Sequence, residues 1–257
     1  MLSFQQVVKI HLILRCLSPQ IFQKFIKIKM VDSMITLCNR FTEYKCGNVA
    51  IVVDVLRAST TITTLLSFID EVYITTSTSK KENAIYIGER KGRKIEGFDF
   101  GNSPTEILAN KDIIKERYEN GEKVILTTTN GTRVLKSLDA EHIFIGAIVN
   151  AKYVAKAVED FEDVSLVPCH RENNFAIDDF IGCGVIAKYL NGEFDEFIKA
   201  ALELTKHDWM SLILNSSSAE NLKNLGYEKD VTFAILENSI DAVGIYKKDK
   251  SKVVRFK

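Results

Sequence analysis

Short apolar runs alternate with amphipathic segments along the chain from residue 49 onward. Each run is rich in β-branched residues and ends in a polar loop, and the segment after the loop repeats apolar residues at helical spacing. The runs that we predict to be strands are residues 48–54, 84–88, 123–127, 142–150 and 164–168. The segments that we predict to be helices are residues 58–68, 133–138, 151–161 and 175–190.

This alternation predicts a largely parallel, mixed sheet with helices on both faces. The strands are apolar at nearly every position, as strands buried on both sides are, and Asn150 is placed to cap the helix after it. With three prolines and no linker in the chain, we predict one three-layer α/β/α domain over residues 34–257. Two similar halves that meet near residue 140 are one way to build it.

The N-terminal segment differs from this domain. Its first 31 residues carry five basic side chains and no acidic one. Charged residues and Pro19 interrupt its apolar positions, so it fits neither a signal peptide nor a membrane span. We set residues 1–33 apart as an extension, and two interpretations stay open: a basic amphipathic surface helix, or a start codon assigned upstream of a true beginning at Met30 or Met34.

Composition limits the partners. The chain has 34 basic and 34 acidic side chains, which does not favour nucleic acid or a membrane surface and leaves a small molecule as the expected partner. Its five cysteines are odd in number and form no CxxC pair. This pattern argues against a disulfide framework or a structural zinc site and indicates a cytoplasmic location.

Polar loops follow the predicted strands at their carboxyl ends, where open parallel sheets bind ligands. Taken singly, each loop has a plainer interpretation, such as a helix cap, a solvated charged loop or an acidic first helical turn. The four loops with suitable chemistry are VVDVLRAST (52–60), GERKGRKIEGFDFGNSPTE (88–106), LTTTNGTR (126–133) and RENNFAIDDF (171–180).

The third loop has six consecutive short polar residues, at positions 127–132, which is more than a turn requires. Its hydroxyls and backbone N–H groups can face an anion at a helix N-terminus, with Gly131 permitting a tight turn. Arg133 adds a forked donor that suits phosphate, carboxylate or sulfonate. The residues predicted to cradle a phosphate are Thr127, Thr128, Thr129, Asn130 and Gly131.

The loops together predict clustered carboxylates beside clustered arginines. This combination is typical of a hard divalent cation next to a multiply charged anion, and Mg²⁺ with a phosphoryl group is the simplest case. The carboxylates are Asp54, Glu89, Asp99 and Asp179, and the arginines are Arg57, Arg90 and Arg133. Cysteine-dependent and histidine-dependent phosphatase motifs, P-loop and dinucleotide motifs, and a paired DxD are absent from the sequence.

In this order, the four loops are similar to those of the 2-phosphosulfolactate phosphatase family. The similarity spans about residues 48–190 and continues more weakly through residues 222–231. The combination of Gly-Glu-Arg, Gly-Phe-Asp-x-Gly-Asn-Ser-Pro and Thr-Thr-Thr-Asn-Gly-Thr-Arg is specific. The resemblance implies a Mg²⁺-dependent phosphatase that converts 2-phospho-3-sulfolactate into 3-sulfolactate and phosphate, a step of coenzyme M biosynthesis in methanogenic archaea.

Two features depart from the family pattern. Asp178–Asp179 stands where the family has Glu-Asp, and PCHRENN (168–174) stands where it tends to have small residues and glycine. These differences leave two alternatives open: a phosphatase for another phosphorylated 2-hydroxy acid, and a non-catalytic anion-binding homologue.

We expect the site residues to divide into three groups. The catalytic group is Asp54, Arg57, Asp179 and Arg133; the metal group is Asp54, Glu89 and Asp99; and Arg90, Asn102, Ser103 and residues 127–131 bind the substrate. Whether Asp54 or Asp179 acts as base, metal ligand or nucleophile stays open, and attack by metal-bound water is favoured over an aspartyl-phosphate at Asp54 because no second acid lies two residues away. Apolar helices such as residues 176–190 leave room for a homodimer.

Overall fold

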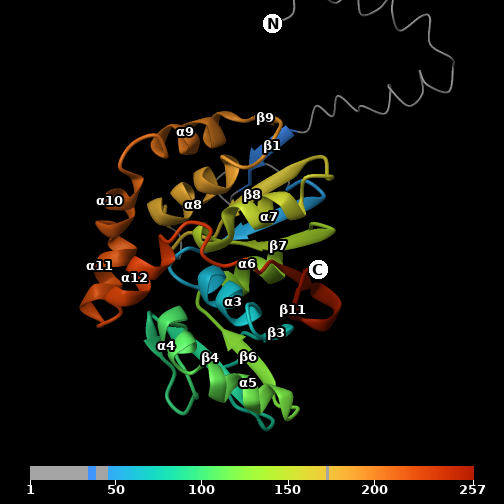
Figure 1. The fold of residues 1–257 in the computed structure, drawn as a ribbon, viewed down its shortest axis with the longest axis vertical. Coiled ribbons are helices and arrows are strands. Elements are labelled where there is room, and N and C mark those ends of the chain that lie inside the picture. Colours follow the sequence, from blue (N-terminus) through green and yellow to red (C-terminus); the bar gives the residue numbers. More distant parts are fainter. Residues whose placement is uncertain (1–33, 39–45, 172–173) are drawn as a thin grey trace, which may run out of the picture. The chain divides into compact units, whose positions relative to one another are not determined.

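The computed structural model describes residues 34–38, 46–171 and 174–257, which fall in one compact unit. The extension predicted for residues 1–33 lies outside the described residues. The described chain forms an 11-stranded sheet in the order β5-β4-β6-β3-β11-β10-β7-β2-β8-β1-β9. Helices flank this sheet (Figure 1).

The strands are β1 (Met34–Leu37), β2 (Val49–Val53), β3 (Glu71–Ile74), β4 (Ala84–Arg90), β5 (Arg93–Lys94), β6 (Lys123–Thr127), β7 (His142–Gly146), β8 (Val164–Pro168), β9 (Glu193–Phe194), β10 (Gly244–Lys247) and β11 (Lys252–Arg255). The helices are α3 (Ala58–Leu66), α4 (Pro104–Ala109), α5 (Lys111–Glu119), α6 (Gly131–Ser137), α7 (Ala151–Ala157), α8 (Ile177–Ala187), α9 (Glu196–Leu204), α10 (Trp209–Leu214), α11 (Ser217–Asn224) and α12 (Glu228–Ala234). The 3₁₀ turns are η1 (Ile148–Asn150) and η2 (Lys248–Lys250).

Two parallel blocks make up most of the sheet. One contains β4, β6 and β3, and the other contains β7, β2, β8, β1 and β9. The antiparallel hairpin β10–β11 lies between them, because β11 pairs with β3 and β10 pairs with β7. The sheet is therefore largely parallel and mixed, as predicted, and its two blocks are joined by the last strands of the chain.

The core lies on both faces of the sheet, as β2 illustrates. Val49, Ile51 and Val53 pack into the cluster with α7, α8, α9 and α10. Ala50 and Val52 point the other way, into the cluster with α3, α4, α5 and α6. Successive strand residues face opposite sides of a sheet, so an apolar residue at every position is required here. The predicted three-layer α/β/α architecture is confirmed.

The predicted strand over residues 142–150 is too long. Strand β7 ends at Gly146 and the 3₁₀ turn η1 follows. The side chain of Asn150 makes no capping hydrogen bond to α7. It accepts the Ala147 N–H at 2.8 Å and donates to the Ala242 carbonyl at 3.0 Å. Asn150 therefore braces the turn against the segment before β10, and its prediction as a helix cap is wrong.

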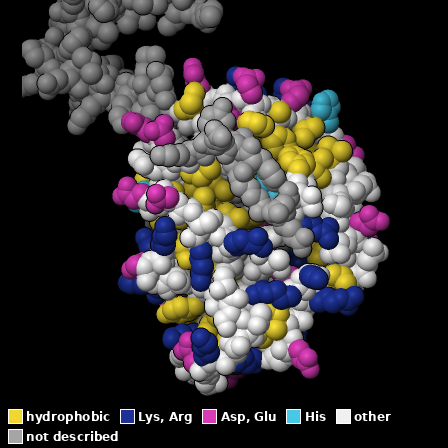
Figure 2. Space-filling model, turned by 180° about the vertical axis from the view of Figure 1, so that it is seen from behind, with side chains coloured by type: hydrophobic (Ala, Val, Ile, Leu, Met, Phe, Trp, Pro, Cys, Tyr) yellow, Lys and Arg dark blue, Asp and Glu magenta, His cyan; other side chains and the backbone are white. Residues whose placement is uncertain are grey.

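Charge is unevenly distributed on the surface, although it is balanced over the whole chain. On the face opposite to the view of Figure 1, Lys and Arg side chains gather across the middle, while Asp and Glu lie mainly at the edge (Figure 2). Such a field attracts anions over a distance of about one Debye length. Within the described residues, no helix combines the length and apolar character that a bilayer crossing needs.

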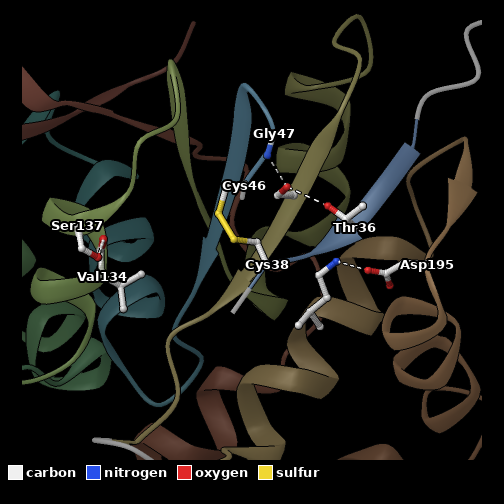
Figure 3. The surroundings of a disulfide bond; sticks show 9 residues. Thr36, Cys38, Cys46, Gly47, Val134, Ser137 and Asp195 are labelled. Carbon is white, nitrogen blue, oxygen red and sulfur yellow. Dashed lines mark hydrogen bonds between the residues drawn. A yellow bond between two sulfur atoms is a disulfide. The ribbon is translucent and has the colours of Figure 1, made fainter. Parts of the chain in front are cut away.

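A disulfide joins Cys38, directly after β1, to Cys46, shortly before β2 (Figure 3). The two Cα atoms are 5.4 Å apart. The neighbouring backbone is held by Ser165 of β8, whose Oγ accepts the Gly47 N–H at 2.9 Å and lies 3.0 Å from Thr36 Oγ1. The prediction against disulfides is therefore wrong for this pair, because pairing depends on distance in the fold and not on CxxC spacing.

Removal of this disulfide should destabilise the protein. A bond between cysteines eight positions apart restricts the unfolded chain by about 2–3 kcal/mol. We therefore expect the Cys38→Ser/Cys46→Ser variant to melt roughly 5–10 °C lower than the wild type, as measured by circular dichroism. Dithiothreitol should lower the melting temperature of the wild type to that of the variant and leave the variant unchanged. An unchanged wild-type melting temperature in dithiothreitol would contradict the bond.

Candidate active site

A cavity of about 410 Å³ lies at the carboxyl ends of β2, β4, β6 and β8, and all four loops singled out in the sequence contribute to its wall. These strands belong to both parallel blocks. Helix α11 adds a further part of the wall. Among the described residues, the acidic side chains that line the cavity are Asp54, Glu89, Asp178 and Asp179, and the basic ones are Arg57, Lys91 and Arg171.

Asp54 follows β2 and lies at the start of α3. Its Oδ1 accepts the Ala58 N–H at 3.0 Å, and the side chain is 8% exposed. Burial raises the pKa of Asp54 to about 7; the Ala58 N–H opposes this rise, and the charges of Asp178 and Glu89 add to it. Asp54 can therefore take up or release a proton near neutral pH.

Asp178 and Asp179 lie in the first turn of α8. Asp179 accepts the Val55 N–H at 2.8 Å and the His170 N–H at 2.9 Å, so it fastens the loop after β2 to the loop after β8. Burial raises its pKa well above the usual range, and the charges of Asp178 and Asp54 add to this effect. Burial also raises the pKa of Asp178 to about 6. Asp178 Oδ1 has no hydrogen-bond partner among the described residues.

Glu89 joins the loop after β4 to the loop after β6, in the block that contains these two strands. Its Oε1 accepts the Thr129 N–H at 2.6 Å, and its Oε2 accepts the Gly92 N–H at 2.7 Å. The side chain is buried. Both carboxylate oxygens thus hold backbone N–H groups, and one of these groups belongs to the loop that was predicted to cradle a phosphate.

The threonine-rich loop is closed on itself. The Thr128 N–H donates to Thr132 Oγ1, and the Thr132 N–H donates to Thr128 Oγ1, both at 3.1 Å. Thr128, Thr129 and Asn130 line the cavity, whereas Thr127 is buried away from it and accepts a hydrogen bond from Arg90. The short polar side chains therefore build the turn as well as facing the cavity.

Gly131 is needed for close approach. A Cβ atom at this position would lie 2.8 Å from Ala58 Cβ and 3.0 Å from Asp54 Oδ2. The beginnings of α6 and α3 therefore meet here, and a side chain would push Asp54 away. From the sequence we expected Gly131 to permit a tight turn. The structure shows that glycine is required here because the neighbouring loop, with Asp54 and Ala58, approaches so closely.

Of the three predicted arginines, only Arg57 lines the cavity. Arg90 donates to the Glu89 and Thr76 carbonyls and to Thr127 Oγ1, which fixes it behind the loop. Arg133 is exposed, and within the described chain its one side-chain hydrogen bond goes to the Thr129 carbonyl, at 3.4 Å. Lys91 and Arg171 stand in the cavity wall instead, contrary to the prediction.

Asp99 does not join Asp54, contrary to the prediction. Its carboxylate is bound by Arg117 at 2.8 Å and by Lys80 at 3.2 Å, outside the cavity. Asn102 does line the cavity, and its Oδ1 has no hydrogen-bond partner among the described residues. Ser103 caps α4 and donates to Asp230, so its role here is in the wall behind the cavity.

His170 lies in the PCHRENN segment, of which residues 172–173 are outside the described chain. Its backbone has a φ of 54°, in the left-handed region that glycine adopts readily and other residues rarely do. The His170 N–H bonds to Asp179, and its ring Nδ1 accepts the Ala176 N–H at 3.2 Å. The carboxylate of Asp179 therefore holds this residue in a conformation that is typical of functional sites.

The donor set suits a hard cation. Within the described residues, no three His, Cys, Asp or Glu side chains form a ready-made metal site. However, Asp178 Oδ1 and Asn102 Oδ1 are buried acceptors with no hydrogen-bond partner among the described residues, and burial raises the pKa of Asp54. Mg²⁺ usually binds through one or two carboxylates together with water and substrate oxygens. Asp54 and Asp178 fit that pattern, whereas Glu89 already binds two N–H groups.

Comparisons with known proteins show the family of this chain. A family model described as 2-phosphosulpholactate phosphatase matches residues 36–249. A protein from Clostridium beijerinckii named probable 2-phosphosulfolactate phosphatase is 35% identical over 223 residues, covering 79% of this chain and 91% of that protein. Proteins of the same name from Thermotoga petrophila and Carboxydothermus hydrogenoformans are 33% and 35% identical, covering 83% and 75% of this chain and 94% and 84% of those proteins.

These matches, on an α/β/α fold with a charged cavity, define the chain as a phosphoric monoester hydrolase. It belongs to the 2-phosphosulpholactate phosphatase family. The resemblance predicted from the four loops is thereby confirmed.

Replacement of Glu89 tests its part in holding the two loops. Glu89→Gln keeps the shape but offers one acceptor oxygen in place of two, so one buried N–H is left unpaired. We expect a loss of about 1–3 kcal/mol in the free energy of unfolding, measured with urea. Glu119→Gln, at an exposed residue of α5, is the matched control and should change stability little. Equal stability of the two variants would contradict the role of Glu89 in holding the two loops together.

The stability of the metal-free protein should fall as pH rises. Between the ordinary Asp54 pKa of 3.8 and the folded value of about 7, the folded protein holds a proton that the unfolded chain has released. The contribution of Asp54 to the free energy of unfolding is therefore fully present below pH 3.8 and is lost as pH rises through about 7. In EDTA, the wild type should melt roughly 5–10 °C lower at pH 8 than at pH 5. Asp54→Asn should reduce this difference without abolishing it, because Asp178 and Asp179 also have raised pKa values. An identical pH dependence of the variant would refute the assignment.

Proposed function

We propose that this chain hydrolyses 2-phospho-3-sulfolactate to 3-sulfolactate and phosphate with the help of Mg²⁺. The observation that carries the proposal is the cavity in which four carboxylates and three basic side chains meet at the ends of β2, β4, β6 and β8. Family membership and the names of the relatives point to the same reaction.

The charge balance of the cavity argues for a cation. Phosphate, carboxylate and sulfonate groups together bring roughly four negative charges at neutral pH. Three basic residues line the cavity against four acidic ones, and Arg57 is already paired with Asp230. When Asp54, Asp178 and Asp179 are ionised, an anionic substrate would therefore meet a net negative wall unless Mg²⁺ entered with it or before it.

Three groups of residues would share the work. Asp54 and Asp178, with the Asn102 side-chain carbonyl, would hold Mg²⁺, which would neutralise charge on the phosphoryl oxygens. Arg57, Lys91 and Arg171 would bind and orient the anionic groups of the substrate. Glu89 and Asp179 would keep the loops in place through their backbone hydrogen bonds.

Hydrolysis also needs a group that attacks phosphorus or takes a proton from water. Asp54 is the best-placed candidate, because burial brings its pKa to about 7. Attack by water and attack by the Asp54 carboxylate itself both depend on this residue, so loss of its charge should stop the reaction under either route.

The wider context consists of predictions from the sequence. The relatives named above are bacterial, so the role in coenzyme M biosynthesis and the archaeal setting stay predictions, as do a homodimer and the lack of nucleic-acid binding. We propose a cytoplasmic location from the cysteine pattern, although the Cys38–Cys46 disulfide favours a less reducing environment.

Phosphate release from synthetic 2-phospho-3-sulfolactate tests the proposal. We expect release with Mg²⁺, at least about 100-fold less in EDTA, and recovery when Mg²⁺ is restored. Phospholactate, which lacks the sulfonate, should be a poorer substrate with a higher KM. Asp54→Asn should reduce kcat by at least about 1000-fold, because it removes both the charge and the base.

Three results would overturn parts of this proposal. Equal activity in EDTA would show that the reaction does not need Mg²⁺. A preference for phospholactate would show that the substrate is another phosphorylated 2-hydroxy acid. Tight phosphate binding by the wild type without any release would instead identify a non-catalytic anion-binding homologue.

A further inference from the structure

Asp230 is a fully buried carboxylate on α12, at 0% exposure, and it does not line the cavity. Its Oδ2 accepts Arg57 NH1 at 2.7 Å. Its Oδ1 accepts Ser103 Oγ at 2.7 Å and Thr105 Oγ1 at 2.5 Å, both at the beginning of α4. One carboxylate thus connects α12, α4 and the loop after β2.

Arg57 is held by three neighbouring groups. NH1 bonds to Asp230 and NH2 donates to the Gly92 carbonyl at 2.9 Å. The guanidinium lies 4.4 Å from the centre of the Tyr227 ring, just before α12. The residue is 3% exposed but still contributes to the cavity wall.

The contacts of Arg57 run from the site to a part of the chain far away in sequence. Asp230 is 173 positions from Arg57. Helices α9 to α12 follow one another around one side of the sheet, and α12 lies beside α4 (Figure 1). The orientation of Arg57 therefore depends on a helix that supplies no residue to the cavity wall.

We propose that Asp230 is a positioning residue, which fixes the Arg57 guanidinium in the orientation that binds the substrate anion. This rests on the proposed function, in which Arg57 contacts the substrate. An arginine side chain has many rotamers, and the hydrogen bonds from NH1 to Asp230 and from NH2 to the Gly92 carbonyl limit it to a few of them. The part of Arg57 that contributes to the cavity wall is then fixed before the substrate arrives.

A double-mutant cycle tests this role. Asp230→Asn should lower kcat/KM for 2-phospho-3-sulfolactate by about 10–100-fold, mainly through KM, because Arg57 loses its anchor. In the Arg57→Ala background the same change should have no further effect, since no guanidinium is left to position. Thr105→Val is the matched control: it removes another donor to Asp230 without touching Arg57, and should keep kcat/KM within about 2-fold.

A second variant and a second readout keep the test decisive. If Asp230→Asn does not fold, Asp230→Glu keeps the charge and moves the carboxylate by one methylene, and should show the same non-additivity with Arg57→Ala. Affinity for inorganic phosphate, measured by calorimetry, should also fall in Asp230→Asn and should show no further fall when this change is made in the Arg57→Ala background. This second readout remains valid if the wild type hydrolyses no phosphosulfolactate, in which case the proposed function fails separately.

Two results would overturn the positioning role. One is full kcat/KM and phosphate affinity in a folded Asp230→Asn protein. The other is an equal loss from Asp230→Asn with and without Arg57, which would mean that Asp230 acts through the general stability of α4 and α12.

Discussion

Burial of like charges is the constraint around which this molecule is arranged. The charge of Asp178 raises the pKa values of Asp54 and Asp179, and the charge of Asp54 also raises that of Asp179, on top of the larger effect of burial. Such a cluster is unfavourable by itself, and the fold tolerates it through backbone N–H donors from Val55, Ala58 and His170. Each donor comes from a loop that follows a strand, so the groups that limit the repulsion also fix the shape of the cavity.

Two carboxylates of the cavity hold loops together through backbone hydrogen bonds. Asp179 and Glu89 each accept two N–H groups from separate loops, and each thereby holds one side of the cavity together. Carboxylates that hold backbone have few lone pairs left for a ligand. Among the described residues, Asp178 Oδ1 and Asn102 Oδ1 have no hydrogen-bond partner, so the acceptors that we propose for a ligand lie on other side chains of the same cavity.

The sequence predicted the strands β2, β4, β6 and β8 and the loops after them, because continuous apolar runs and polar strand ends are local signals. It could not predict which side chains of a loop face inward. Arg90 points behind its loop while Lys91, at a φ of 53°, lies in the wall. Asp230 and the Cys38–Cys46 pair were missed for a similar reason, since their partners are fixed only by tertiary packing. The short strands at the end of the chain carry too few residues for a periodic pattern.

The hairpin β10–β11 joins two blocks that each contribute loops to one cavity. Until residues 244–255 have been synthesised, β3 and β7 have no strand between them, and each exposes an unpaired edge. The cavity therefore cannot be completed before the hairpin residues have been synthesised. A chain that is released before residue 244 has two open sheet edges, and nothing holds together the two blocks whose loops form the cavity.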